Sequence, residues 1–339
     1  MTYFAKLKKF FWFFVKLAIA GGIVAYLAFK NPTEIIDGFR SFNYIWLVPA
    51  LLFYLLHMLV CAWRWHRLTR ILGVRLSGFE ALSLTMQGYF FSLVVKMGVL
   101  SKRTRPGAKM EGAFTILMDR IVGMIALFAL ALLLLVPAVP VLMKIEVPNI
   151  AIDDGMRILF IICLAGLCIA GLGASSVIFF HRFIEKLPVF GPLMKWGDRI
   201  SHGMVTRLTS ATDVYLGCWP ELCKLVVISI FFVHLMTVVP FAFLMTGLGL
   251  HVNLLTLVIA VTIGNIIGLI PLFPAGVGGR DVATVTILVA GSVAVGDAKT
   301  GQLLYTAIVL FFNLIGGLFF ILDPGRRNTE QLLEEELEA

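Results

Sequence analysis

The stretch Pro271-Leu-Phe-Pro-Ala-Gly-Val-Gly-Gly-Arg-Asp281 places an adjacent arginine and aspartate behind two prolines and three glycines. Apolar segments flank this stretch, Leu254–Ile270 before it and Val282–Val295 after it, which predicts that it lies at membrane depth. Ionisable residues at that depth are rare and costly, so Arg280 and Asp281 form a candidate functional site. Proline and glycine cannot continue a lipid-facing helix, because exposed irregular backbone is costly in hydrocarbon. We therefore expect a helix break that is buried in protein or beside a water-filled cavity.

The chemistry available at this break is anion binding. A helix that begins near Gly278–Asp281 would direct free N–H groups and the positive end of its dipole into the membrane interior, an arrangement that binds phosphate. Arg280 adds a fork of donors that matches phosphate oxygens, and Asp281 can hold that fork or act as the helix N-cap. The structural alternative is that Arg280 and Asp281 neutralise each other, or pair with Asp119 and Arg120, to close the bundle.

The composition identifies the class of protein that holds this site. Of 339 residues, 60% are hydrophobic and 14% are charged, with a mean hydropathy of +0.96. Soluble domains are about 45–50% apolar and about 25% charged, so this is a polytopic membrane protein. The net charge of +8 comes from bases in short loops, where they orient helices, and we expect no nucleic-acid partner. The five cysteines show no Cys-x-x-Cys spacing, and we expect no metal and no cofactor.

The apolar segments predict the topology. Six are long enough to cross a bilayer: Phe10–Phe29, Tyr44–Trp63, Gly112–Val136, Arg157–Phe180, Leu222–Thr246 and Gln302–Leu322. The positive-inside rule then places both termini in the cytoplasm, and two further apolar segments must each begin and end on one side. We predict an all-α polytopic membrane protein with six full transmembrane helices plus two oppositely oriented re-entrant hairpins, at about 79–100 and 254–295. This arrangement is compatible with an inverted repeat.

The remaining parts of the chain give less specific signals. Residues 1–325 form one integral membrane domain in this interpretation, and residues 326–339 form an acidic cytoplasmic tail. The cytoplasmic stretch 182–215 has an apolar stripe at helical spacing, which indicates either a lipid-contacting surface helix or, as we favour, a helix against the bundle. This stripe comprises Leu193, Trp196, Ile200, Met204, Leu208 and Tyr215. Gly264-Asn-Ile-Ile-Gly268 favours close helix packing, with Asn265 available as a polar contact.

The sequence contains none of the common enzymatic constellations. It lacks a Gly-x-Ser-x-Gly elbow, a nucleotide-binding glycine loop with its lysine, and a His-Glu-x-x-His helix. We therefore expect that the protein is not an enzyme. Any transport must be passive, coupled to an ion gradient or potential, or driven by a partner.

Four segments carry a resemblance to a known family. In order they are Trp63-Arg64-Trp65, Gly88-Tyr-Phe-Phe91, Leu117-Met-Asp-Arg120 and Pro271 to Asp281. With them, the chain resembles the flippase-like transmembrane family named after the membrane region of lysylphosphatidylglycerol synthases, from about Trp63 through the final span. The resemblance implies a multi-pass protein of the cell inner membrane. In the bifunctional synthases this region is linked to translocation of aminoacylated phospholipid, and a separate soluble domain does the aminoacyl transfer. Because the chain ends at Ala339, we expect that soluble domain to be absent.

The resemblance has one departure, in the first hairpin. Family members usually carry a Pro-Gly…Gly-Gly-Asp stretch there, whereas Phe91-Ser-Leu-Val-Val-Lys96 passes straight through. Either the stretch has been lost or, as we favour, the sequence omits a loop near Val94-Val95, because arms of about 11 residues with no turn residue make a poor hairpin.

Together these observations predict a lipid translocase that binds the anionic headgroup of a phospholipid or a polyprenyl phosphate. The predicted headgroup-binding residues are Pro274, Gly276, Gly278, Gly279, Arg280, Asp281, Asn265, Lys96, Asp119 and Arg120. The alternative function is a non-transporting scaffold or accessory subunit for a lipid-modifying or cell-envelope enzyme. The predicted partners are membrane lipids, with a homo-oligomer or an envelope-biogenesis enzyme also open.

Overall fold

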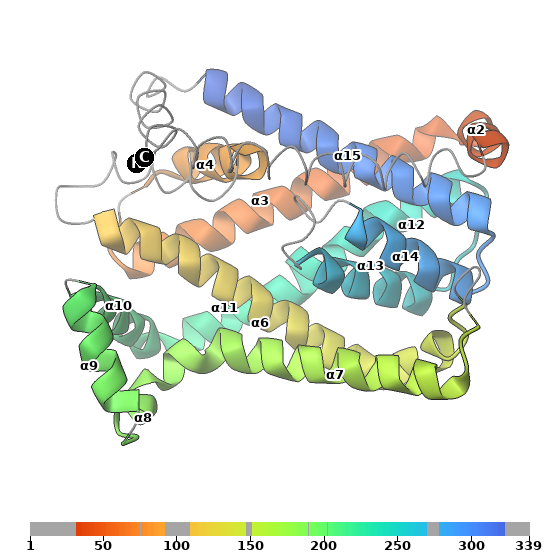
Figure 1. Cartoon of the computed structure of the whole chain (residues 1–339). Coiled ribbons are helices and arrows are strands. Elements are labelled where there is room, and N and C mark those ends of the chain that lie inside the picture. Colours follow the sequence, from red (N-terminus) through yellow and green to blue (C-terminus); the bar gives the residue numbers. More distant parts are fainter. Residues whose placement is uncertain are drawn as a thin grey trace, which may run out of the picture.

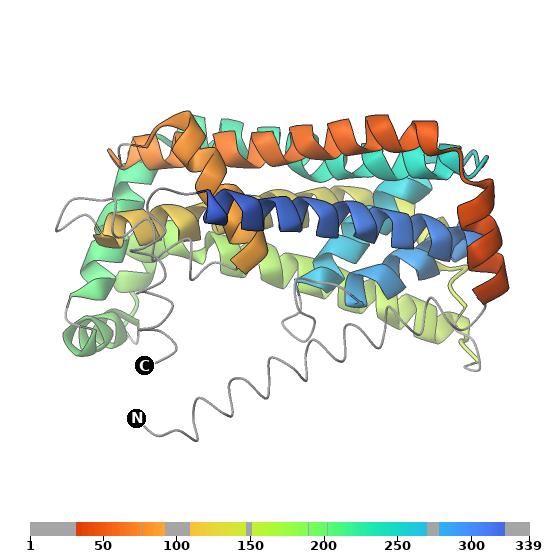
Figure 2. The same ribbon diagram turned by 90° about the horizontal axis from the view of Figure 1, so that it is seen from above.

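A computed structural model describes residues 32–74, 76–91, 109–146, 151–188, 190–201, 203–269 and 278–322. Over these residues the chain is helical and contains no strand. The long helices lie roughly along one axis and form an elongated bundle, with short helices at both ends (Figure 1). Seen from above, α2 (Pro32–Ser41) crosses one end of the bundle (Figure 2).

Five helical segments of the described chain are long and apolar enough to cross a membrane. They are Tyr44–Ile71, Gly112–Leu142, Asp154–Glu185, Trp219–Gly247 and Val295–Ile321. These segments confirm five of the six predicted spans in their predicted order. The first predicted span, Phe10–Phe29, lies outside the described residues, as does the acidic tail.

Four of these spans are each built mainly on one long helix, and two of the four add a short turn or helix at one end. The long helices are α3 (Leu47–Ile71), α6 (Lys109–Leu142), α7 (Asp154–Ser176) and α15 (Val295–Ile321). The 3-10 turn η1 (Tyr44–Trp46) leads into α3, and its N-cap Asn43 accepts a hydrogen bond from the Ile45 backbone at 3.2 Å. Many of their outward side chains are large, apolar and exposed, as a lipid-facing surface requires. Examples are Leu52, Leu133, Leu159, Leu314 and Leu318.

The span Trp219–Gly247 is irregular. It begins as α11 (Trp219–Ser229), passes through one π turn, η3 (Ile230–His234), and a 3-10 turn, η4 (Leu235–Thr237), and continues as α12 (Val238–Gly247). A π turn disturbs the regular ladder of backbone hydrogen bonds. Here the Val233 carbonyl accepts a hydrogen bond from Nδ1 of His57 on α3 at 3.0 Å. The hydrogen bond to a carbonyl of the π turn therefore connects this span to α3.

Two short helices, α13 (Leu254–Gly268) and α14 (Gly279–Ala290), pack side by side in antiparallel directions. At 1.5 Å per residue they are about 22 and 18 Å long, less than the roughly 30 Å of a bilayer core. Glycine permits their close approach, because a Cβ at Gly264 would collide with Thr284 and one at Gly291 would collide with Thr256. This confirms the close packing predicted at Gly264. Residues 270–277, between these helices in the sequence, lie outside the described residues.

The first predicted hairpin is described only in its first arm. That arm is α4 (Gly78–Phe91), which lies between α3 and α15 (Figure 1). Gly316 of α15 faces it so closely that an added Cβ would collide with the Met86 carbonyl. The return arm, with Lys96 and the region of Val94-Val95, lies outside the described residues. The re-entrant character of both hairpins stays a prediction.

The stretch 182–215 forms three short helices rather than one. They are α8 (His181–Glu185), which follows the turn η2 (Val177–Phe180), α9 (Phe190–Ile200) and α10 (Met204–Gly217). Gly203, with a φ of +84°, separates α9 from α10, so the predicted stripe is divided between two helices. Trp196 and Ile200 on α9 are exposed, whereas Tyr215 on α10 is buried and its hydroxyl donates to the Leu68 carbonyl at 3.0 Å. Only α10 therefore packs as the favoured interpretation expects.

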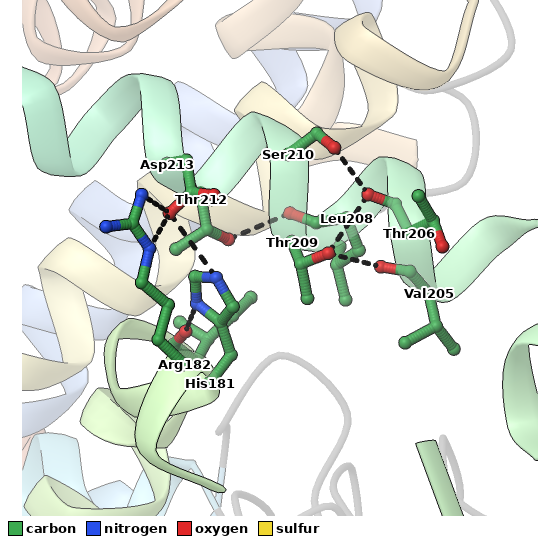
Figure 3. A network of polar contacts seen from close by, with 10 residues as sticks. His181, Arg182, Val205, Thr206, Leu208, Thr209, Ser210, Thr212 and Asp213 are labelled. Carbon is green, nitrogen blue, oxygen red and sulfur yellow. Dashed lines mark hydrogen bonds and ion pairs between the residues drawn. The ribbon is translucent and has the colours of Figure 1, made fainter. Parts of the chain in front are cut away.

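Ion pairs and hydrogen bonds connect these short helices. The Asp213 carboxylate accepts from Nε of Arg182 at 2.8 Å and lies 3.4 Å from Nε2 of His181, which ties α10 to α8 (Figure 3). The Asp198 carboxylate on α9 accepts from the backbone and the hydroxyl of Thr206 on α10, at 2.8 and 2.7 Å. These polar contacts thus hold the three helices together at the end of the bundle.

Candidate functional site

A helix begins at the end of the break predicted around Gly278–Asp281. Helix α14 begins at Gly279, and Gly278 before it has a φ of +94°, which glycine adopts without strain. The Asp281 carboxylate reaches back and accepts a hydrogen bond from the Gly278 backbone N–H at 3.0 Å. Asp281 therefore caps the helix from its third position, and the N-cap residue itself is Gly278. Of the two alternative roles predicted for Asp281, the contact with the Arg280 fork is formed, whereas the N-cap position is not its own.

The Asp281 carboxylate is the centre of a buried polar cluster. Its side chain is 2% exposed. Oδ1 accepts from Nε2 of Gln302 at 2.7 Å and from the hydroxyl of Thr306 at 3.1 Å, both on α15. Nε and Nη2 of Arg280 also donate to this oxygen, at 3.3 Å each. The Arg280 guanidinium thus balances the negative charge, and the two donors on α15 join that helix to α14.

Arg280 retains donors that are not used by this cluster. Its side chain is 12% exposed, and its guanidinium lies 5.6 Å from the centre of the Tyr305 ring, a cation–π contact. Nη1 makes no hydrogen bond to any residue that the structure describes. The pair that the structural alternative expected between Arg280 and Asp281 is therefore present, but it leaves part of the fork available to an anion.

A second charged cluster centres on Arg64 of α3. Its Nε donates to Oδ1 of Asp119 on α6 at 2.9 Å, and its Nη1 donates to the Ser229 hydroxyl on α11 at 3.0 Å. Gly123 makes room for the guanidinium, because an added Cβ there would lie 3.4 Å from Nη1. Asp119 is thus held by Arg64, so the alternative pairing of Asp119 with Arg280 is not formed. Arg64 was not among the predicted site residues.

A cleft of about 90 Å³ opens beside this second cluster. It lies between α3, α4 and α6, and it is lined by Cys61, Arg64, Thr85, Gly88, Tyr89, Ile116, Asp119 and Arg120. Arg120 is exposed and makes no hydrogen bond or ion pair with a described residue. The cleft therefore contains a cation whose charge no described residue neutralises.

One face of α3 connects the two clusters. The Tyr54 ring lies 6.1 Å from that of Tyr305 and 5.5 Å from that of His57. Because His57 donates from Nδ1 to a carbonyl, its Nε2 is free to accept from the Cys61 thiol, 3.8 Å away. Tyr54 and Arg64 are ten residues apart, about 15 Å along the helix. Polar and aromatic side chains therefore line the bundle interior between the clusters.

The structure divides the predicted site residues between two depths. Thr306, beside Asp281, is eleven residues from the start of α15, about 16 Å along its axis. Arg64 is seven residues from the opposite end of α3, about 10 Å. Gly278, Gly279, Arg280 and Asp281 belong to the first cluster, and Asp119 and Arg120 belong to the second.

The other predicted residues contribute less. Asn265 is partly buried on α13 and makes no hydrogen bond to a described residue. Lys96, Pro274 and Gly276 lie outside the described residues. Arg64 was missed because it directly follows the predicted span Tyr44–Trp63, where the positive-inside rule explains a basic residue as part of a cytoplasmic loop. A signal was nonetheless present, since His57, Cys61 and Arg64 recur at spacings of four and three residues and so share a helix face.

The comparisons agree with this architecture. The chain matches the family described as "Lysylphosphatidylglycerol synthase TM region" over residues 13–317. No curated protein and no solved structure gave a match. The matched residues include the first four described spans, most of the fifth, both charged clusters, and α13 and α14. With most of its length matched, the chain belongs to the family of the lysylphosphatidylglycerol synthase transmembrane region.

Proposed function

We propose that this protein is a lipid translocase, which moves an anionic phospholipid or a polyprenyl-phosphate-linked lipid across the cytoplasmic membrane. The observation that carries this proposal is the Arg280–Asp281 pair at the start of α14, inside an apolar helix bundle. Charged residues at membrane depth are expensive and mark substrate pathways. Membership of a lipid-related membrane family supports the same conclusion.

In this mechanism the lipid phosphate binds at the unused donors of Arg280 and the positive end of the α14 dipole. Asp281 holds the guanidinium in position, and Gln302 and Thr306 hold Asp281. Arg120, in the cleft at the other depth, offers a second cation to the headgroup. The headgroup can then cross the bilayer beside polar side chains, while its acyl chains stay in lipid.

The proposed topology places the basic end of the bundle in the cytoplasm and makes this a multi-pass protein of the inner membrane with both termini inside. The end formed by α8, α9 and α10 supports this orientation through the positive-inside rule. Its bases include Arg182, Lys186, Arg199 and Arg207. We further propose that α4 belongs to a re-entrant hairpin from that side and that α13 and α14 form one from the opposite side.

Leaflet exchange of labelled lipids in proteoliposomes tests the function. We expect faster exchange of an anionic lipid with the wild-type protein than in empty liposomes. Arg280→Lys should strongly impair exchange and leave the fold intact, because lysine keeps the charge and loses the planar fork. Arg67→Lys is the matched control, since Arg67 pairs with Glu221 at the partly exposed end of α3.

The double variant Arg280→Leu, Asp281→Leu separates a binding role from a structural one. Replacing both partners of a buried pair by apolar residues leaves no charge unpaired, so the remaining cost is the lost acceptor of Gln302, Thr306 and the Gly278 N–H. We expect a folded and inactive protein. A folded double variant that still moves lipid would overturn the role assigned to Arg280, and equal exchange with and without the wild-type protein for a panel of anionic lipids would overturn the function.

A non-transporting scaffold is the second candidate function, and the exposed apolar side chains of Trp196 and Ile200 on α9 favour it. In this case α9 and α10 recruit an envelope enzyme or a second copy of the chain. Reversing the charge of Lys195, Arg199 and Arg207 would then abolish function, while Arg280→Ala would have no effect. The translocase proposal expects the opposite order of effects.

A further inference from the structure

A long apolar groove runs along α13 and α14 on the side that faces α6 and α7. Its volume is about 510 Å³, within the roughly 300–1,000 Å³ of ligand pockets. Aliphatic and aromatic side chains form its walls, among them Leu142, Phe160, Ile263, Ile267, Val282 and Ile287. Such a lining excludes a headgroup and suits a hydrocarbon chain.

The two ends of the groove are chemically different. One end is walled by Gly278 and Gly279, the start of α14 and part of the first charged cluster. The other end is walled by Arg157, in the first turn of α7. From Gly278 to Ile287 is nine residues, about 14 Å, close to half of the roughly 30 Å bilayer core. The groove therefore has the length of an acyl chain in one leaflet.

At the outer end of the groove, two nitrogens of the Arg157 guanidinium donate hydrogen bonds to described residues and the third does not. Its Nη1 donates to Oδ1 of Asp154 at 2.7 Å and its Nε donates to the Ile145 carbonyl at 3.2 Å. Its Nη2 makes no hydrogen bond to a described residue. The Asp154 side chain is 74% exposed, so this ion pair lies in a wet region where a phosphate can compete for the guanidinium.

We propose that this groove binds one acyl chain of a phospholipid whose phosphate contacts Arg157, in the leaflet opposite the basic end of the bundle. The inference rests on the proposed function, for which it supplies the lipid site of that leaflet. The bound chain ends beside Gly278 and Gly279, so the same lipid is held next to the cluster that receives its headgroup during translocation. Glycine at these two positions keeps side chains out of the inner end of the groove.

Photo-crosslinking in nanodiscs tests the groove. The full chain is irradiated with an anionic phospholipid that carries a diazirine in its acyl chain, and the labelled residues are mapped by mass spectrometry. We expect labels on Ile263, Ile267 and Val282. Ala283→Phe, which fills the groove, should lower this labelling about tenfold, the change that a loss of about 1.4 kcal/mol produces. Leu314→Phe, at a 64% exposed position of α15, should leave it unchanged.

A second variant tests the phosphate contact and does not depend on repacking. Arg157→Gln should weaken labelling by the phospholipid several-fold, while labelling by a diacylglycerol with the same diazirine chain stays the same. Labels spread evenly over the exposed apolar faces, or groove labels that persist in Ala283→Phe, would overturn the proposal. Equal loss of labelling by both probes in Arg157→Gln would overturn the phosphate contact. Specific labelling without leaflet exchange would refute the translocase and leave the groove site standing.

Discussion

Arg64 of α3 donates from Nε to Oδ1 of Asp119 on α6 at 2.9 Å, although the two residues are 55 positions apart in the chain. Both side chains are largely buried, at 7% and 14% exposed. The attraction between the two charges therefore offsets the free energy that each loses on leaving water. The pair thereby fixes which faces of α3 and α6 meet and how far each helix is shifted along the other.

Removing one partner of this pair should destabilise the protein more than removing both. Arg64→Leu or Asp119→Leu leaves a buried charge without its partner, at a cost of about 3–5 kcal/mol, whereas the double variant is expected to recover most of that loss. Denaturant unfolding in detergent measures the difference. A double variant less stable than either single one would contradict this prediction.

The Arg67–Glu221 pair provides the matched control for that experiment. It lies on the same helix, with an N–O distance of 2.7 Å and side chains 39% and 26% exposed. Partly exposed pairs contribute about 0–1 kcal/mol, so Arg67→Leu should have a small effect.

Thr306→Val should destabilise the protein by about 1–3 kcal/mol, because it removes a donor from the buried Asp281 carboxylate without changing the side-chain shape. Thermal unfolding measures the loss. Thr246→Val is the control, since the Thr246 hydroxyl donates only to a carbonyl of its own helix, that of Ala242. Similar losses in both variants would show that the carboxylate does not depend on Thr306.

Gly264→Ala should cost about 1–3 kcal/mol, because its new methyl group would collide with the Thr284 hydroxyl across the α13–α14 contact. Adding Thr284→Ala should restore part of the stability by removing that hydroxyl. Gly166→Ala on α7, where no atom lies within 4 Å of an added Cβ, should be neutral or slightly stabilising. A double variant as unstable as Gly264→Ala alone would rule out the collision as the cause.

The junction between α9 and α10 should respond to pH through Asp198. The backbone N–H and the hydroxyl of Thr206 donate to its carboxylate and lower the pKa of that group below its ordinary value of 3.8. Because the pKa of Asp198 is lower in the folded than in the unfolded protein, its ionised carboxylate stabilises the fold. This contribution is complete above the pKa of the unfolded state, and it is lost as the pH falls through the pKa of the folded state.

Nuclear magnetic resonance titration of the Asp198 carboxyl checks this prediction. Thr206→Val should raise the pKa toward 3.8, because it removes one of the two Thr206 donors. Thr209→Val should not change it, since the Thr209 hydroxyl donates only to the carbonyls of Val205 and Thr206 (Figure 3). An unchanged pKa in Thr206→Val would contradict the assignment.

The sequence alone determined the class of fold and the local features. Long apolar segments predicted the five described spans, because a bilayer requires about 20 apolar residues whatever the rest of the chain does. Glycine before Arg280 and Asp281 predicted where α14 begins, since local backbone conformation depends mainly on the residues themselves. Glycine at position 264 predicted close helix contact, because a residue without a side chain lets the neighbouring helix approach.

The tertiary structure alone decided which of these features meet. Helical spacing shows that His57, Cys61 and Arg64 share a face of α3, but it does not show that this face meets Asp119 and Ser229. Nor does it show that Arg280 and Arg120 lie at different depths, or that Gln302 and Thr306 bind Asp281. In lipid, the hydrophobic effect does not select the rotation or the height at which two apolar helices meet, because lipid accepts any apolar face. The partners are therefore selected by the combined packing and hydrogen bonding of the whole bundle, which no single segment contains.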